Sequence, residues 1–443
     1  MTPEIIFAHL EAAVNHVADN IRAFVKNPEG DFTRNGKIPI KKILSFLVYQ
    51  GSNTLGNELN EAYNFSADRP SASAFVQKRA KLKPEGVKEM FHQFTRSLYK
   101  HLPTPEYRLI ADDGSTLSFL SNPKLAEKKY HTKQGNTEKG CYGVHINAFY
   151  DLDTNLYFDA EIQPVAEKDE YAAFAMMVDR YPVRKESPAI FIVDRGICSY
   201  NNMAHVIEKG QFFLFRAKDI ESKGLLHKIE FPDTEEFDTS VKLILYRNQT
   251  QKNKSLLPDG NHRFIGKDTS FHFLDPGAPG FYELSFRAVR FKLSDESFET
   301  LVTNLPPDSF SVEKLKELYN RRWGIETSFR HLKYSVGMIK LHASKPEFVR
   351  QEVWARLIAY NFTIAVISCV HIPVSSRKFS YKISVAAAVF ACKEFIRDAL
   401  TLHTFNIVAL LSRELIPIRP DRHFSRLKTA HFRKPAYFIY RPS

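Results

Sequence analysis

The segment AIFIVDRG, residues 189–196, is an unbroken apolar run of strand length that stops at an acidic residue. Runs of this length and composition are consistent with a strand buried inside a sheet. A second segment, YRLIADDGS at residues 107–115, is a short apolar stretch followed by two carboxylates and a glycine. The two segments predict core strands with Asp113 and Asp194 at their carboxyl ends.

Strand and helix patterns alternate around these segments. Residues 141–164 form two strand patterns joined by a turn, and residues 170–181 form an amphipathic helix pattern. A helix ending before Gly210 follows the second acidic segment, and QFFLFRAKD, residues 211–219, predicts one more strand. This order predicts an α/β fold in which helices flank a mixed sheet.

Hydrophobic patterns divide the rest of the chain. The first hundred residues have apolar positions at helical spacing, whereas the stretch after the core strands is strand-prone and rich in turns. We predict a helical, candidate DNA-binding region at 1–100, the first part of the core at 101–217, a β-rich insertion at 218–305, a helix completing the core at 306–345, and a helical region with a basic tail at 346–443.

The charge of the chain bears on its partners. Lysines and arginines number 62 against 50 aspartates and glutamates, which gives a formal charge of +12. This excess favours a nucleic acid as partner, because each phosphate that a basic side chain neutralises releases a counterion. Net charge also promotes simple solubility, so the charge by itself is compatible with either interpretation.

One stretch of the N-terminal region has the pattern of a DNA-reading module. A helix, a turn and a second helix place Gln77, Lys78, Arg79 and Lys81 on the second helix. The alternative is a small helical bundle with a solvated basic face, and this segment alone favours that alternative. The arginine-rich tail is the second candidate for reading DNA ends.

The cysteines and the hydropathy of the chain indicate the cellular compartment of the protein. None of the four cysteines forms a C-x-x-C pair, which argues against a zinc site, and their scarcity favours a reducing, cytoplasmic compartment. The first residues lack the basic and apolar regions of a signal peptide. The longest apolar stretches are too short to cross a bilayer, so we expect no membrane partner.

Asp113 and Asp194 have a possible chemical role. Ligand sites in α/β sheets favour the carboxyl ends of strands, and two carboxylates there could chelate Mg²⁺. Acidic residues also commonly begin the loops that follow strands, so either aspartate alone supports both interpretations. Asp112 competes with Asp113, because neighbouring strand residues face opposite sides and only one can enter a given site.

A third acidic residue lies on a predicted helix. At 3.6 residues per turn, Tyr319, Arg322, Glu326 and Lys333 fall within an arc of about 60°, beside an apolar stripe that would pack on the sheet. Glu326 would then complete a metal shell. Arg322 and Lys333 would hold phosphate oxygens while Tyr319 donates a hydrogen bond. The alternative, favoured for this helix alone, is a solvated face with Arg322 and Glu326 paired at i,i+4 spacing.

This helix carries a family resemblance. LYNRRWGIETSFRHLKYSVGM, residues 318–338, resembles the Y-(2)-R-(3)-E-(6)-K signature of DDE transposases of the insertion-sequence-four type, with Tyr319, Arg322, Glu326 and Lys333 in register. ADDGST at 111–116 resembles the first-aspartate block, in which the aspartate precedes glycine, and so favours Asp113 over Asp112. FIVDRG at 191–196 resembles the second-aspartate block. Further similar segments are TNLP at 303–306, FLFRAKD at 213–219, which contains Arg216, and VRQEVWARLIAYN at 349–361.

The resemblance implies an RNase H-like catalytic core interrupted by the β-rich insertion. It implies that Asp113, Asp194 and Glu326 hold two Mg²⁺ or Mn²⁺ ions, and that basic and phenolic groups contact DNA phosphates. The predicted phosphate contacts are Tyr319, Arg322, Lys333 and Arg216. The implied activity is cleavage at the terminal inverted repeats of an insertion sequence and joining to double-stranded target DNA. We expect at least a dimer on DNA, in a bacterial cytoplasm and associated with the nucleoid.

Two other functions compete with this one. An RNase H-like nuclease would cut DNA without joining strands, and a DNA-binding descendant of a transposase would do neither. The intact triad argues against the second alternative. Some members of the family cut through a DNA hairpin, in which Trp323 would stack on a flipped base. The helical angle of Trp323 lies outside the arc of Tyr319, Arg322, Glu326 and Lys333, so we favour a buried core tryptophan.

Overall fold

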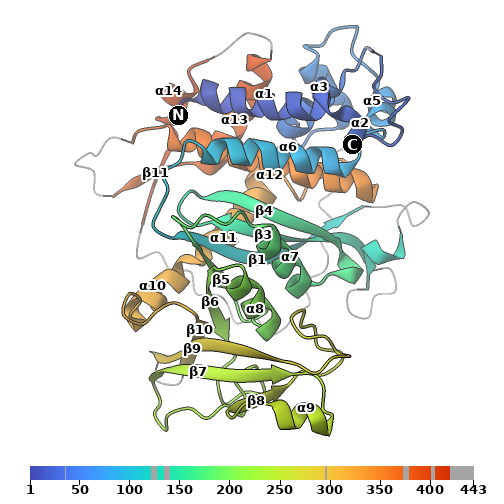
Figure 1. Cartoon of the computed structure of the whole chain (residues 1–443). Helices are drawn as coiled ribbons and strands as arrows, with labels where there is room; N and C mark the ends of the chain where they lie inside the picture. Colours follow the sequence, from blue (N-terminus) through green and yellow to red (C-terminus); the bar gives the residue numbers. More distant parts are fainter. Residues whose placement is uncertain are drawn as a thin grey trace.

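The computed structural model describes residues 1–34, 36–120, 127–133, 140–294, 297–372, 379–400 and 405–419. A layer of helices lies at one end of a long sheet, and a β-rich region lies at the other end (Figure 1). Ten strands belong to this sheet: β1 (Arg108–Phe119), β2 (His131–Thr132), β3 (Cys141–Asp151), β4 (Leu156–Pro164), β5 (Ala189–Val193), β6 (Phe212–Ala217), β7 (Phe237–Tyr246), β8 (Asn261–Phe264), β9 (Phe281–Ser294) and β10 (Ser297–Thr303).

The strand directions define the core of the fold. The order across the sheet is β2-β3-β1-β5-β6-β10-β9-β7-β8, with β4 pairing on β3. Strands β1, β3 and β4 form an antiparallel meander, whereas β5 and β6 run parallel to β1. An antiparallel meander followed by parallel strands is the RNase H-like arrangement. The expected α/β fold with a mixed sheet is therefore confirmed.

Helices cover both faces of this core. On one face lie α7 (Glu170–Arg180) and α8 (Tyr200–Glu208). On the other lie α10 (Val312–Arg321), α11 (Trp323–Arg330) and a π-helical turn at His331–Ser335. Strand side chains alternate between faces. Leu109 and Ala111 of β1 therefore pack on the face covered by α10 and α11, whereas Ile110 packs on the face covered by α7 and α8.

The turn between β3 and β4 contains Asp153, Thr154 and Asn155 and joins the two strands predicted within residues 141–164. Asn155 has a φ of 59°, a left-handed conformation that asparagine tolerates well. The Asp151 carboxylate accepts the backbone N–H groups of Asp153 and Thr154 at 2.9 and 3.0 Å. A buried Arg108 donates to the same carboxylate at 2.6 Å. The turn is therefore attached to the strand that carries Asp113.

The N- and C-terminal regions together form the helical layer (Figure 1). Its long helix α12 (Pro346–Ser368) packs against α6 (Pro84–Tyr99) and is buried along most of its length. The remaining elements are α1 (Pro3–Asp19), α2 (Ile21–Phe24), α3 (Ile40–Tyr49), α4 (Leu55–Ala62), α5 (Ala72–Arg79), α13 (Val385–Ala399), α14 (Ile407–Leu411) and a small sheet of β11 (Tyr381–Ile383) and β12 (Leu415–Pro417).

The basic face expected on the second N-terminal helix is only partly present. Arg79 on α5 is 3% exposed and donates to Glu352 at 3.0 Å and to Gln351 at 2.7 Å, both on α12. Lys81 pairs with Asp31 at 2.7 Å. The interpretation of Arg79 as a solvated or DNA-facing residue is therefore wrong, because its charge neutralises a buried carboxylate.

The strands between residues 218 and 305 extend the core sheet. Strand β10 pairs with β6, and β9, β7 and β8 follow outward, with the short helix α9 (Gln251–Leu256) at the far end (Figure 1). The division of the chain into five parts stays a prediction, but β10 lies inside the sheet that carries the predicted aspartates. Within the described ranges, no helix combines the length and the apolar character needed to cross a membrane.

Candidate active site

Strand pairing brings two predicted acids and one predicted cation to the same level of the sheet. Val193, the last residue of β5, pairs with Asp112 on β1 and with Phe215 on β6. The residues that directly follow these three are Asp194, Asp113 and Arg216. Asp113, Asp194 and Arg216 are therefore neighbours across adjacent strands. The residues two positions before each of them all pack in the core beneath α10 and α11. Because side chains alternate, all three face these helices.

Asp112 lies on the opposite face of β1. It is 1% exposed, and burial raises its pKa well above the ordinary value, with the nearby Asp113 and Glu170 carboxylates adding to the effect. A carboxyl group on that face cannot reach the helix that carries Glu326. Of the two adjacent aspartates, Asp113 is the one on the same side as the other predicted site residues.

The segment that carries Tyr319, Arg322, Glu326 and Lys333 is not one regular α-helix. Ser311 caps its start by accepting the N–H of Lys314 at 3.3 Å. Between α10 and α11 the backbone tightens, since the Arg322 N–H bonds to the Tyr319 carbonyl three residues back at 3.0 Å. After α11, the N–H of Val336 bonds to a carbonyl five residues back at 2.9 Å, as in a π-helix.

The prediction for Lys333 assumed a regular α-helix of 3.6 residues per turn, and the π-helical turn changes the direction of its side chain. Lys333 nevertheless reaches the site. Burial lowers the pKa of its ammonium, while the Asp113 carboxylate acts in the opposite direction. Lys333 thus lies within electrostatic reach of Asp113. π-Helical turns occur frequently at functional sites, where they redirect a side chain.

Contacts among the remaining predicted residues link the helix to the strands. The Tyr319 hydroxyl donates to Asp194 Oδ1 at 3.2 Å, and an Arg216 nitrogen lies 3.6 Å from the same oxygen. On the helix itself, Arg322 donates to Glu326 at 2.9 Å. The structure therefore brings all seven predicted site residues to one face of the sheet. The phosphate contacts predicted for Tyr319, Arg322, Lys333 and Arg216 stay predictions, and the Tyr319 hydroxyl is directed at Asp194.

The three carboxylates are close enough to affect one another. Burial raises the pKa of Asp113 to about 6, and the negative charges of Glu326 and Asp194 contribute in the same direction. The Gly114 N–H, at 2.8 Å from Asp113 Oδ1, and the Arg322 guanidinium oppose the rise. Mutual repulsion among acids in a partly buried site is relieved when a cation binds between them.

Glu299 is a fourth acid at this site and is not among the residues predicted from the sequence. Its carboxylate lies 3.4 Å from Arg216, and its side chain is 10% exposed. Burial raises its pKa, Arg216 opposes the rise, and Asp194 adds to it, so Glu299 is within electrostatic reach of the predicted triad. Its segment was assigned to the insertion. The alternating pattern of β10 was the available signal, but the pairing of β10 with β6 was not visible.

The donor set fits a hard divalent cation. Carboxylate oxygens are the ligands that Mg²⁺ and Mn²⁺ prefer. Across the described residues, no three His, Cys, Asp or Glu side chains are gathered tightly enough to hold a metal as they stand. Glu326 is held by Arg322, and Asp194 by Tyr319 and Arg216. These partners must move aside before the acids can share a cation.

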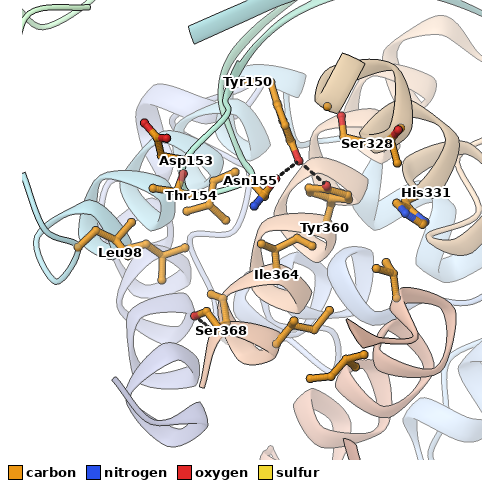
Figure 2. A pocket seen from close by; sticks show the side chains of 18 of the residues that line it. Leu98, Tyr150, Asp153, Thr154, Asn155, Ser328, His331, Tyr360, Ile364 and Ser368 are labelled. Carbon is orange, nitrogen blue, oxygen red and sulfur yellow. Dashed lines mark hydrogen bonds between the residues drawn. The ribbon is translucent and has the colours of Figure 1, made fainter. Parts of the chain in front are cut away.

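A large cavity lies on another side of the helix that carries Glu326. It has a volume of about 780 Å³ and is lined by Ser328 and His331 of the helix, by Tyr360 of α12 and by the β3–β4 turn. Figure 2 shows the Tyr150 hydroxyl bonded to Asn155 and Tyr360 at its wall. None of the seven predicted site residues is among the described residues that line it. The cavity is separate from the acidic site.

Trp323 lines this cavity and is 50% exposed. The favoured interpretation as a buried core tryptophan is therefore wrong. The next residue explains part of this placement. A Cβ on Gly324 would lie 3.1 Å from the Leu152 side chain, so Gly324 lies close against the β3–β4 turn.

The raised pKa of Asp113 predicts a pH-dependent effect on stability. Between its ordinary value of 3.8 and its folded value of about 6, the folded protein keeps a proton that the unfolded chain has lost. Stability therefore falls as the pH rises through this window and stays lower above it. We expect Asp113→Asn to stabilise the metal-free protein by about 2 to 3 kcal/mol at pH 8 and to have little effect below pH 4. Urea unfolding at both pH values measures this, and an equal change at both would contradict it.

A comparison with protein-family models shows the family of the chain. The family model described as "Transposase DDE domain" matches residues 104–362, which is more than half of the chain. The matched range contains the three predicted acids, the four predicted phosphate contacts and Glu299. The helical region before residue 104 lies outside the match.

Individual relatives match over shorter segments. The putative transposase InsL for insertion sequence element IS186A of Escherichia coli K12 is 37% identical over 59 residues, 13% of this chain and 16% of that protein. The transposase InsG for insertion sequence element IS4 of the same organism is 40% identical over 54 residues, 12% of each. The matched segments thus span less than a fifth of the curated relatives' length.

A solved structure of a piggyBac transposase synaptic complex with hairpin DNA aligns with a TM-score of 0.46 and 12% sequence identity, covering 100% of this chain and 91% of that one. The assignment to a family rests on the family model instead, because that match extends over more than half of the sequence and includes every predicted site residue. The chain belongs to the family defined by the transposase DDE domain.

Proposed function

We propose that this protein is an insertion-sequence transposase that cuts DNA at the element's ends and joins the freed ends to target DNA. The observation that carries the proposal is the placement of Asp113, Asp194 and Glu326 on one face of the sheet, where the Tyr319 hydroxyl bonds to Asp194 and Arg322 bonds to Glu326. Membership of the transposase DDE family supports it. Partners would be double-stranded DNA at terminal inverted repeats and at the target.

In this proposal, the three acids would hold two Mg²⁺ or Mn²⁺ ions. When bound, such ions activate a water or a 3′-hydroxyl as nucleophile and stabilise the leaving oxygen of an in-line displacement. Asp113 and Asp194 supply carboxylates from adjacent strands, and Glu326 supplies one from the helix. Lys333 is placed to neutralise charge beside Asp113, and Tyr319 orients Asp194 through its hydrogen bond.

The cations around the triad would bind the substrate. Once Arg322 leaves Glu326 and Arg216 leaves Asp194, both guanidinium groups can hold phosphate oxygens with paired N–H donors. Arg322 is buried among Tyr319, Trp323 and Glu326, so its planar group is already oriented. We expect these contacts to position the phosphate without reading the base sequence.

The decisive experiment uses the DNA that flanks the gene. Purified full-length protein is incubated with Mg²⁺ and a duplex that carries the flanking inverted repeat, and the products are resolved on a sequencing gel. We expect cleavage at the repeat end and transfer of a pre-cut 3′-hydroxyl end into a second duplex. Cleavage without transfer would favour the nuclease, and binding without either reaction would favour the non-enzymatic descendant.

Two further proposals follow from this chemistry. Joining both ends of an element to one target requires them to be held together, so at least two protomers are expected on DNA. Light scattering of the protein with repeat-end duplex measures this stoichiometry, and one protomer per duplex without pairing of ends would contradict it.

The bacterial relatives and the low cysteine content are compatible with a cytoplasmic, nucleoid-associated protein.

A further inference from the structure

Arg216 lies between two carboxylates that belong to different strands. One of its terminal nitrogens is 3.6 Å from Asp194 Oδ1, and the other is 3.4 Å from Glu299 Oε2. The three side chains come from the end of β5, from β6 and from β10. Arg216 is therefore a cation shared by a predicted metal ligand and by an acid that has no assigned role.

The sheet places Glu299 where it must face Arg216. Leu301 of β10 pairs directly with Arg216, and Glu299 lies two residues away on the same strand. Side chains two apart on a strand share a face, so Glu299 and Arg216 lie on the side of the sheet that carries the triad. The Glu299 side chain is 10% exposed, and Arg216 is its only ion-pair partner among the described residues.

A guanidinium close to Asp194 opposes the arrival of a divalent cation at that carboxylate. The oxygen that faces Arg216 also accepts the Tyr319 hydroxyl, so both partners compete with a metal for its lone pairs. Like charges within a few ångströms repel strongly in a partly buried site. Arg216 must withdraw from Asp194 before a metal can bind, and Glu299 is the second carboxylate already within reach.

We propose that Glu299 is a positioning residue that draws the Arg216 guanidinium away from Asp194 and so opens this carboxylate to a divalent cation. The inference rests on the proposed metal site at Asp194. With Glu299 ionised, Arg216 keeps a charged partner after it leaves Asp194. In its new position it stays beside the site, where a phosphate oxygen is its next partner. Without Glu299, the guanidinium has no other carboxylate to pair with and remains on Asp194.

Binding of Mn²⁺ to the full-length protein tests this without turnover. Electron paramagnetic resonance counts free Mn²⁺ during a titration, and thermal unfolding checks that each variant is folded. We expect Glu299→Gln to weaken Mn²⁺ binding about tenfold, and Glu299→Asp, which keeps the charge, to stay within about threefold of the wild type. Normal binding by Glu299→Gln would overturn the proposal.

A double-mutant cycle separates positioning from direct ligation. In an Arg216→Gln background there is no guanidinium to draw away, so adding Glu299→Gln should leave Mn²⁺ binding unchanged. An undiminished loss in that background would mean that Glu299 ligates the metal itself or supports the fold, and the proposal would be wrong. Asp194→Ala is the separate control, because normal Mn²⁺ binding by this variant would contradict the metal site and not only the role of Glu299.

Discussion

Glu326→Gln is expected to lower both DNA cleavage and strand transfer by about 10³-fold or more, equivalent to about 4 kcal/mol of transition-state stabilisation. Glutamine keeps the size of the side chain and can still accept a hydrogen bond from Arg322, but it removes the negative charge needed to hold a divalent cation. Gel analysis of repeat-end cleavage measures the activity. Affinity for the same duplex, measured without metal, should change by less than about threefold.

A matched control comes from the preceding helix. Glu317→Gln on α10 makes the same chemical change at an exposed position two residues before Tyr319, and we expect wild-type cleavage from it. If Glu326→Gln also cleaves normally, Glu326 is not part of the triad. If it loses DNA affinity together with cleavage, its role is in binding and not in the chemical step.

Arg79→Met is expected to destabilise the protein by about 3 to 5 kcal/mol, because it leaves a buried charge without its partner. Arg79 donates to the Glu352 carboxylate, to the Gln351 side chain and to the Phe348 carbonyl. Glu352 is fully buried, and although burial acts to raise its pKa, Arg79 and neighbouring cations hold that pKa below its ordinary value. Urea unfolding at pH 7 measures the loss.

Two comparisons show whether the buried charge is the cause. Adding Glu352→Gln to Arg79→Met should recover part of the lost stability, because the orphaned carboxylate is then neutral. Lys26→Met removes a cation from an exposed pair, 2.6 Å from Glu347 at the start of the same helix, and should cost less than about 1 kcal/mol. Equal losses from Arg79→Met and Lys26→Met would contradict the prediction.

Local patterns were sufficient for the parts of the fold that depend on nearby residues. The apolar runs ending at Asp113 and Asp194 lie in strands, and the amphipathic segment between them is a helix. Asp194 follows the end of β5 as predicted, but the prediction that Asp113 ends its strand is wrong, because β1 continues to Phe119 through its pairing with β3. The spacing of Tyr319, Arg322 and Glu326 placed them on one side of a helix because about two turns separate them. These features follow from periodicity and side-chain alternation, which a single sequence displays.

Long-range pairing explains the features that were missed. Arg79 looked like a surface cation because its partner Gln351 is 272 residues later in the chain. Glu299 was placed in the insertion because only the pairing of β10 with β6 brings it beside Arg216. The π-helical turn at Lys333 has no local signature in the sequence, since its hydrogen bonds depend on how the helix end packs.

The attachment of the three acids to the fold has a consequence for how the site adapts to its substrate. Asp113 and Asp194 are tied together by the backbone hydrogen bonds of adjacent parallel strands, which fix their spacing within narrow limits. Glu326 stands on a helix that reaches them through side-chain contacts, such as the Tyr319–Asp194 hydrogen bond, and not through backbone pairing. Any adjustment of the gap between the acids on binding of the proposed DNA substrate must therefore come from a shift of this helix, with the two aspartates as its stationary reference.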